Sequence, residues 1–154
     1  MAMLNLRDVL RPLWILGIGL SLVAWVGWLG WGGTAIAASA SAETVLVHLG
    51  TVDGQLVFQP NQFDFTAGQR YKLVLDNPSD QKHYFTAKDF ADGIWTQKVE
   101  AAGVEVKGAI HELELKPGAV AEWVFVPQRP GQYDLRCTIS GHAEAGMTGQ
   151  ITIQ

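Results

Sequence analysis

Three side chains that can bind a metal recur at five-residue intervals near the C-terminus of the 154-residue chain: Cys137, His142 and Met147. Cys137 is the only cysteine in the sequence. A thiolate, an imidazole and a thioether are soft to borderline ligands that suit copper, and a second histidine would complete a His₂Cys plane with a weak axial methionine. His83 is the candidate for that second histidine. The four residues together predict a site for one copper ion.

Each of these residues also has an ordinary structural interpretation. A single cysteine is usually a small buried apolar residue, and a methionine often fills a gap in a core. His142 follows Gly141 and can be read as a turn residue. Metal binding is favoured because three ligand types fall on one loop, which is anchored between the strand-like runs 131–136 and 149–154.

The other two histidines have weaker claims to a metal. His48 alternates with Leu46 along a predicted strand, and His111 adjoins a run of alternating Glu and Leu. Histidine side chains are commonly part-exposed, so both are predicted to lie on strand surfaces. His111 is the substitute ligand if His83 does not bind the metal.

Several segments around these residues resemble those of the cupredoxins, the blue type 1 copper proteins of the rusticyanin and plastocyanin kind. The resemblance rests on Asn77-Pro78 before His83-x-Phe85, on Pro130-Gly131-x-Tyr133 before Cys137, and on a Cys-x4-His-x4-Met loop that closes on Gly149-x-Ile151. The loop lengths are similar to those of rusticyanin-type members and longer than the Cys-x2-His of plastocyanins. The likeness covers about the last 110 residues, the size of a small domain.

The resemblance implies a type 1 copper protein that carries single electrons between redox partners in the periplasm or the thylakoid lumen. It implies the ligand set His83, Cys137, His142 and Met147. Independently of the resemblance, the small residues Ala143, Ala145 and Gly146 beside His142 predict that partners dock there, with the turn at 108–110 at the same end of the domain. Many family members carry Asn directly after the first histidine, where it braces the cysteine loop, and this chain has Tyr84.

Two other functions remain open at this point. A copper-delivery or storage protein would also bind the metal, although such proteins generally use exchangeable sites. A structural or adhesion module on the same sandwich would lack the ligands. An enzyme is not expected, because four protein ligands leave no open position for a substrate, in contrast to catalytic metal sites.

Residues 1–42 differ from the rest of the chain. Arg7 and Arg11 precede an uncharged run from 12 to 42 that ends in an Ala/Ser tract, which is typical of a signal peptide. Residues 13–31 are nearly long enough to cross a bilayer as a helix, which takes about 20 apolar residues. An uncleaved membrane anchor is therefore the alternative. Both interpretations export the domain at 43–154 from the cytoplasm.

From residue 43 onward, short alternating segments are separated by turn residues such as Asp53-Gly54 and Lys116-Pro117-Gly118. The predicted strands are 44–49, 55–58, 71–75, 104–106, 112–115, 120–126, 132–136 and 150–153. This pattern predicts an all-β fold, a Greek-key β-sandwich. One or two helical turns are expected within 87–95.

The charge distribution gives no sign of a nucleic-acid partner. Eleven Lys and Arg residues stand against fifteen Asp and Glu residues, for a formal net charge of −4, and the basic residues are scattered. The sequence also contains no Gly-rich phosphate loop and no serine in a nucleophile motif. We therefore expect a monomeric copper protein whose partners are other redox proteins.

Overall fold

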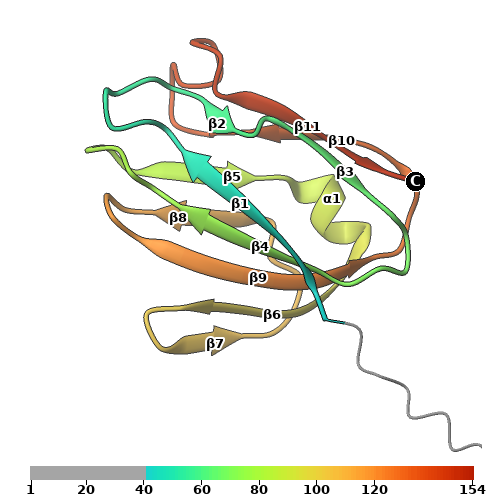
Figure 1. The fold of residues 1–154 in the computed structure, drawn as a ribbon. Helices are drawn as coiled ribbons and strands as arrows, with labels where there is room; N and C mark the ends of the chain where they lie inside the picture. The colour runs from blue at the N-terminus through green and yellow to red at the C-terminus, as the bar shows by residue number, and fades with distance from the viewer. Residues whose placement is uncertain (1–40) are drawn as a thin grey trace, which may run out of the picture. The chain divides into compact units, whose positions relative to one another are not determined.

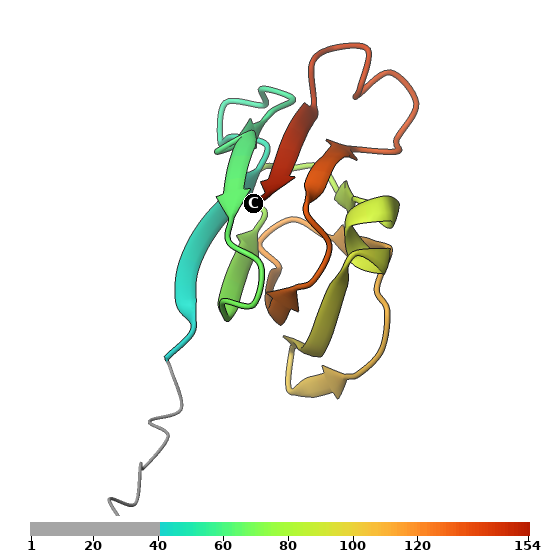
Figure 2. The same ribbon diagram turned by 90° about the vertical axis from the view of Figure 1, so that its right-hand side faces the viewer.

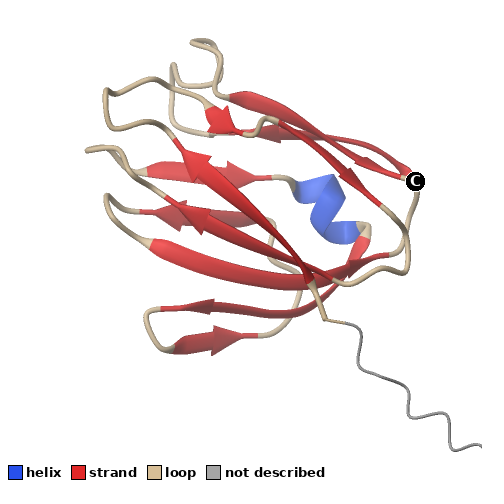
Figure 3. Cartoon of the chain, viewed as in Figure 1, coloured by secondary structure: helices blue, strands red, loops and turns tan. Residues whose placement is uncertain are grey.

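The computed structural model describes residues 41–154, which form two β-sheets that pack against each other (Figure 1). The first sheet has the order β2-β1-β4-β9-β6-β7, with bounds Phe58–Gln59, Glu43–Leu49, Tyr71–Asp76, Val120–Pro127, Ile94–Ala101 and Val104–Val106. The second has the order β3-β11-β10-β5-β8, with bounds Gln62–Phe65, Thr148–Ile153, Gly131–Arg136, His83–Thr86 and Glu112–Leu115. One short helix, α1 (Lys88–Asp92), links β5 to β6 in the described domain (Figure 3).

Alternating side chains along the strands build the core between the two sheets. In β4, Tyr71, Leu73 and Leu75 are buried while the residues between them are half-buried, as expected when one face of a strand packs on a second sheet. Phe90 of α1 is fully buried and meets Phe125 of β9 edge to face, with ring centroids 5.4 Å apart. Such aromatic packing stabilises the sandwich without a contribution from a metal.

Two of the strand pairings are parallel, namely β1 with β4 and β3 with β11. Parallel neighbours cannot be joined by a tight hairpin, so the chain crosses from one sheet to the other between them. The remaining pairs in the described sheets are antiparallel. This arrangement confirms the predicted all-β Greek-key sandwich.

Seven of the eight predicted strands are confirmed, with ends that differ by at most two residues. The prediction of a strand at 55–58 is wrong, because only Phe58 of that range lies in a strand. Thr51 caps a turn here by accepting a hydrogen bond from the Gln55 backbone N–H at 2.9 Å. The predicted helical turns within 87–95 are confirmed by α1.

Three strands were not predicted: β3, β5 and β6. In β5 the neighbouring aromatic residues Tyr84 and Phe85 break the polar–apolar alternation, whereas the alternation of β3 is present in the sequence and was overlooked. In β6 the pairing register shifts between Thr96 and Lys98 at a bulge, and a bulge adds a residue that breaks the alternation.

The loop at 137–147 projects from one end of the sandwich, at the opposite end from the start of β1 (Figure 2). The turn at 108–110 was expected at the same end as this loop, and that expectation is wrong. β8 pairs with β5 so that Leu115 lies opposite His83 and Glu112 opposite Thr86. The residues before Glu112 therefore lie at the end of β5 that is distant from His83.

The predicted signal peptide or anchor at 1–42, with its apolar core at 13–31, falls on residues that the structure does not describe, apart from 41 and 42. It stays a prediction from the sequence. Within residues 41–154, no helix is long and apolar enough to cross a membrane.

Candidate metal centre

The predicted residues His83, Cys137 and His142 meet at the loop end of the sandwich. One possible ligand atom from each lies within 4.8 Å of those of the other two. All three side chains are buried, with exposed fractions of 1% for His83, 1% for Cys137 and 8% for His142. They are the one group of at least three His, Cys, Asp or Glu residues in the described domain with the geometry to hold a metal ion.

Two strands bring these residues together from distant parts of the sequence. His83 is the first residue of β5, and the alternation of that strand turns His83 and Phe85 inward and Tyr84 outward. Cys137 directly follows β10, which pairs with β5 through Arg136 and Thr86. The cysteine therefore arrives beside the histidine because the two strands are neighbours in one sheet.

The loop that carries the other ligands is closed by its own backbone hydrogen bonds. The Cys137 N–H donates to the Met147 carbonyl at 3.1 Å, and the Met147 N–H donates to the His142 carbonyl at 2.9 Å. A third bond runs from the His142 N–H to the Ile139 carbonyl at 3.0 Å. Gly141 has φ +85°, a conformation that costs glycine little and lets the chain turn before His142. These bonds tie the three ligand-bearing residues to one another.

Met147 is fully buried, with 0% of its surface exposed, and belongs to the apolar core. Its backbone is bonded to both Cys137 and His142. Met147, the predicted axial ligand, is therefore held by the same backbone hydrogen bonds as Cys137 and His142, and its thioether is shielded from water.

The Cys137 sulfur has two polar neighbours. The Tyr84 backbone N–H donates to Sγ at 3.4 Å, and Sγ lies 3.5 Å from Nδ1 of His142. Hydrogen bonds around the sulfur are one of the features that tune copper sites of this type. The residue that stands where many cupredoxins carry Asn therefore acts on the sulfur through its backbone.

The Tyr84 side chain points away from the cysteine loop, and its hydroxyl donates to the Glu114 carboxylate. The loop is braced instead by Glu112 of β8. Its carboxylate accepts hydrogen bonds from the hydroxyls of Thr86 at 2.7 Å and Thr138 at 2.8 Å. This link joins the residue after Cys137 to the neighbouring edge strand, and nothing in the sequence pattern of β8 distinguished Glu112 from a solvated side chain.

The surroundings of the two ring nitrogens of His83 show whether these residues fit a metal ion. Its Nε2 lies 2.9 Å from the Ser79 hydroxyl, whereas Nδ1 is the one buried side-chain nitrogen or oxygen in the described domain without a hydrogen-bond partner. Burial, reinforced by the nearby His142 ring, lowers the pKa of His83 below its usual value and so favours the neutral imidazole that binds metals. A buried, unpaired nitrogen beside a thiol and a second imidazole fits copper.

Sequence reasoning missed two residues that position His83. Ser79 bonds the ring, and Gly50 lies so close that a side chain there would meet Nε2. The turn Asn77-Pro78-Ser79, which ends four residues before His83, could have indicated Ser79. Gly50 belongs to a different strand connection, and no local pattern links it to the histidine.

The other histidines do not join the cluster, as predicted. Nδ1 of His48 lies 2.5 Å from a carboxylate oxygen of Asp76, on a neighbouring strand of the first sheet. Nε2 of His111 lies 2.7 Å from a carboxylate oxygen of Asp92. Each ring is part-exposed and paired with an acid.

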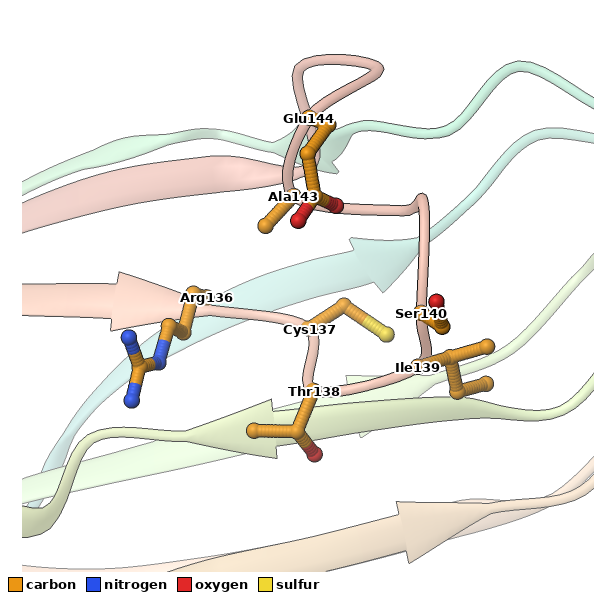
Figure 4. A pocket seen from close by; sticks show the side chains of 7 residues that line it. All are labelled: Arg136, Cys137, Thr138, Ile139, Ser140, Ala143 and Glu144. Atoms are coloured by element: carbon orange, nitrogen blue, oxygen red, sulfur yellow. The ribbon is translucent and has the colours of Figure 1, made fainter.

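A surface hollow of about 210 Å³ lies beside the metal centre, lined by Arg136, Cys137, Thr138, Ile139, Ser140, Ala143 and Glu144 (Figure 4). Figure 4 shows the Cys137 side chain directed away from that of Arg136. Because Cys137 is only 1% exposed, the hollow reaches the backbone and neighbours of the cysteine while the thiol stays shielded.

Comparison with known proteins places these features in a family. Residues 45–154 match the family of copper binding proteins described as the plastocyanin/azurin family. The major chloroplastic plastocyanin isoform of Arabidopsis thaliana is 31% identical over 120 residues, which cover 77% of this chain and 65% of the relative. The chain thus spans about two thirds of the length of that plastocyanin.

Two further proteins are similar at lower identity. The copper-resistant cuproprotein CopI of Pseudomonas aeruginosa is 25% identical over 150 residues, which cover 78% of this chain and 79% of CopI. The structure of auracyanin B superposes with a TM-score of 0.51 at 22% identity, covering 73% of this chain and 89% of auracyanin B, which supports the fold. The matched family, the sandwich and the cluster of buried ligands agree, and the chain belongs to the plastocyanin/azurin family of copper-binding proteins, the cupredoxins.

Proposed function

We propose that this protein carries single electrons between redox proteins, using one type 1 copper ion held by His83, Cys137, His142 and Met147. The observation that carries the proposal is the buried cluster in which the unpaired Nδ1 of His83 accompanies a thiol and a second imidazole. Bound copper would supply a one-electron couple between Cu(I) and Cu(II). The chain supplies the fixed and dry surroundings for that couple.

The protein groups around the cluster are suited to electron transfer more than to catalysis. The loop is closed by backbone hydrogen bonds and Ser79 holds His83, so the ligands need move little when the charge of the metal changes. Four protein ligands would leave no position for a substrate, which catalytic metal sites keep open. The proposal is therefore a carrier and not an enzyme.

The proposed docking site for redox partners is the surface around His142. His142 is the most exposed of the three clustered residues, and small residues follow it in the loop: Ala143 is half-buried, and Ala145 and Gly146 are exposed. The uncharged residues of this surface allow close approach with little desolvation cost, and the exposed Glu144 is the one charged side chain between His142 and Met147. We expect Ala143→Asp to slow electron exchange with a partner while the copper spectrum and the potential stay nearly unchanged.

A matched control for that variant is Gln128→Asp, which makes the same charge change at an exposed residue beyond the end of β9. Stopped-flow measurement of the exchange rate compares the two variants with the parent. Equal rates for all three proteins would move the docking site away from His142.

Copper delivery or storage is a second candidate, supported by the similarity to CopI, whose name describes a copper-resistant cuproprotein. A delivery protein must release its ion to an acceptor. The burial of His83, Cys137 and Met147 argues for slow release and so favours the carrier.

Copper loading of the full chain, followed by visible and electron paramagnetic resonance spectra and a redox titration, tests both candidates. A carrier should show an intense charge-transfer band that disappears on reduction and returns on reoxidation. Copper binding without a reversible cycle, together with transfer of the ion to a metal-free acceptor, would support delivery and reject the carrier.

We propose that the protein acts outside the cytoplasm, in the periplasm or the thylakoid lumen, with residues 1–42 as signal peptide or membrane anchor and 43–154 as the copper domain. The uncharged apolar run and the Ala/Ser tract support export. N-terminal sequencing of the protein recovered from the exported fraction distinguishes the two: a start near Glu43 indicates cleavage, and an intact N-terminus in the membrane fraction indicates an anchor.

A further inference from the structure

We propose that Ser79 is a positioning residue for the metal centre, because its hydroxyl accepts a hydrogen bond from Nε2 of His83 and thereby presents Nδ1 as the metal-binding nitrogen. The inference rests on the proposed copper site. It concerns the metal-free chain as well, so it can be tested separately.

The Asn77 amide, which lies beside Ser79, has its orientation set by hydrogen bonds. Its nitrogen donates to two backbone carbonyls, that of Gln81 at 2.6 Å and that of Leu115 at 2.9 Å. Carbonyl groups only accept hydrogen bonds, so the amide nitrogen must face them. The amide oxygen then faces Ser79, and it accepts from the Ser79 backbone N–H at 3.0 Å.

The neighbours of the Ser79 hydroxyl decide where its hydrogen points. Oγ lies 2.8 Å from the Asn77 amide oxygen and 3.0 Å from the Gln81 carbonyl oxygen. Both are acceptors, so one of them takes the single hydrogen of the hydroxyl. The Gln81 N–H donates to Oγ at 3.3 Å. One lone pair of Oγ remains for the fourth neighbour, Nε2 of His83 at 2.9 Å.

The tautomer of His83 follows from these bonds. Since Oγ meets Nε2 as an acceptor, Nε2 must carry the proton, and in a neutral imidazole the other nitrogen then has the free lone pair. That nitrogen is Nδ1, which is buried and has no hydrogen-bond partner. Partners of this kind fix the tautomer and orientation of metal-binding histidines.

Packing against Gly50 confines the same ring. A Cβ built on Gly50 would lie 2.7 Å from Nε2 of His83 and 3.1 Å from Cβ of Ser79. The positions of the ring and of Ser79 therefore require that residue 50, whose φ is +77°, carries no side chain. The hydrogen bond to Ser79 and the absence of a side chain at Gly50 thus both concern Nε2 of His83.

The Ser79 hydroxyl makes contacts within the turn and also reaches the ring of His83. The turn itself uses the Ser79 backbone N–H, which bonds to the side chain of Asn77, and an alanine at position 79 would keep that bond. Ser79→Ala therefore removes the acceptor for Nε2 together with the contacts of Oγ to Asn77 and Gln81, while the bond from the backbone N–H to Asn77 remains. Ser79→Thr keeps an acceptor in the same place.

The test uses the full chain labelled with ¹⁵N-histidine, which contains four histidines. In the metal-free parent, NMR of the ring nitrogens should show His83 as a single Nε2–H tautomer. Ser79→Ala should lose that preference and bind Cu(I) or Cu(II) roughly 10- to 100-fold more weakly, the effect expected for loss of such a partner. Ser79→Thr should restore both properties, and Thr44→Ala, an exposed hydroxyl in β1, is the control.

A parent-like tautomer and copper affinity in Ser79→Ala would overturn the proposal, as would an Nδ1–H tautomer in the metal-free parent. If the alanine variant does not fold, Ser79→Cys retains the size but offers only a weak acceptor, and it should move both readouts in the same direction; unchanged values would overturn the proposal. A parent that shows the Nε2–H tautomer but no charge-transfer band would reject the copper carrier and not the role of Ser79.

Discussion

His83 enters the metal centre from β5 and contacts Ser79 of the preceding turn and the distant Gly50, whereas Cys137, His142 and Met147 lie on one loop whose backbone bonds to itself. We call the first the strand half, made of His83, Ser79 and Gly50, and the second the loop half, residues 137–147. The strand half combines a local contact, between Ser79 and His83 four residues later, with a distant one between Gly50 and the same ring. The loop half depends mainly on local turns, so its geometry is encoded in a single segment.

The two halves also differ in their access to solvent. His83 is 1% exposed and is covered by Gly50, while His142 is 8% exposed and followed by exposed small residues. A ligand near the surface shortens the path to a docked partner. If partners dock near His142 as proposed, the strand half holds the site in place and the loop half provides the contact with partners.

The largest effect is expected in the loop half, from Cys137→Ser. The thiolate is the source of the charge-transfer band, so the variant should lose the intense colour completely. The metal-free chain should still fold, because burying a hydroxyl costs about 1–3 kcal/mol and the aromatic core is intact. Visible spectra after copper loading and a denaturant titration measure the two effects; an intense band in the variant would show that Cys137 is not the ligand.

The next effect is expected in the strand half, from Gly50→Ala. The positive φ of +77° costs an alanine about 1–2 kcal/mol, and the new Cβ at 2.7 Å from Nε2 of His83 adds about 1–3 kcal/mol of overpacking. Gly54→Ala is the matched control, because Gly54 has φ +81° and a Cβ added there would meet nothing within 4 Å.

Denaturant unfolding of the metal-free chain measures both glycine variants. The difference between them isolates the contact with His83 from the backbone strain that they share. Equal losses of stability would mean that the ring moves aside freely, and the strand half would then be less rigid than the contacts indicate.

A smaller effect, confined to the electronic properties of the site, is expected from Met147→Gln. An amide oxygen is a harder ligand than a thioether and favours Cu(II), and the axial ligand is a tuning position in such sites. The potential should fall by about 59 mV or more, which corresponds to a tenfold change in a one-electron equilibrium. Redox titration measures it, and an unchanged or raised potential would count against Met147 as the axial ligand.

The same comparison explains what could be predicted from the sequence. The loop half could be predicted from the sequence because its three types of metal-binding side chain lie within one short segment. The position of this loop between two strands could also be predicted from the sequence, because residues in strands β10 and β11 alternate in character. His83 was predicted as a ligand. Ser79 was missed although it lies on the turn four residues earlier, and Gly50 was missed because its approach to the ring depends on how a separate strand connection packs in three dimensions.

The errors in the predicted fold have a related cause. The turn at 108–110 was assigned to the wrong end because the register of β8 against β5 cannot be read from either strand alone. Strand β5 itself was missed, although it begins at His83. Its adjacent aromatic residues Tyr84 and Phe85 break the polar–apolar alternation that marks a strand, so the strand was harder to recognise than the histidine at its start.

The smallest effect is expected on the outer face of β5, from Tyr84→Phe. Tyr84 reaches the Cys137 sulfur through its backbone N–H at 3.4 Å, while its hydroxyl points outward to Glu114. Removing the hydroxyl should therefore leave the copper band and potential unchanged. A shifted band would show that the hydroxyl is coupled to the sulfur through the strand, and the outer face would then belong to the strand half.

The hydroxyl should act on acid stability instead. The hydrogen bond from Tyr84, aided by the charge of Lys82, holds the pKa of Glu114 below its ordinary value. A carboxylate with a lowered folded-state pKa stabilises the fold above its unfolded-state pKa, and the contribution is lost as the pH falls through the folded-state pKa. In Tyr84→Phe the pKa of Glu114 should rise toward its ordinary value, so that the contribution becomes smaller and its loss is complete at a higher pH. Carboxyl NMR titration measures the shift, which should be small because Glu114 is at the surface and exposed pairs contribute little.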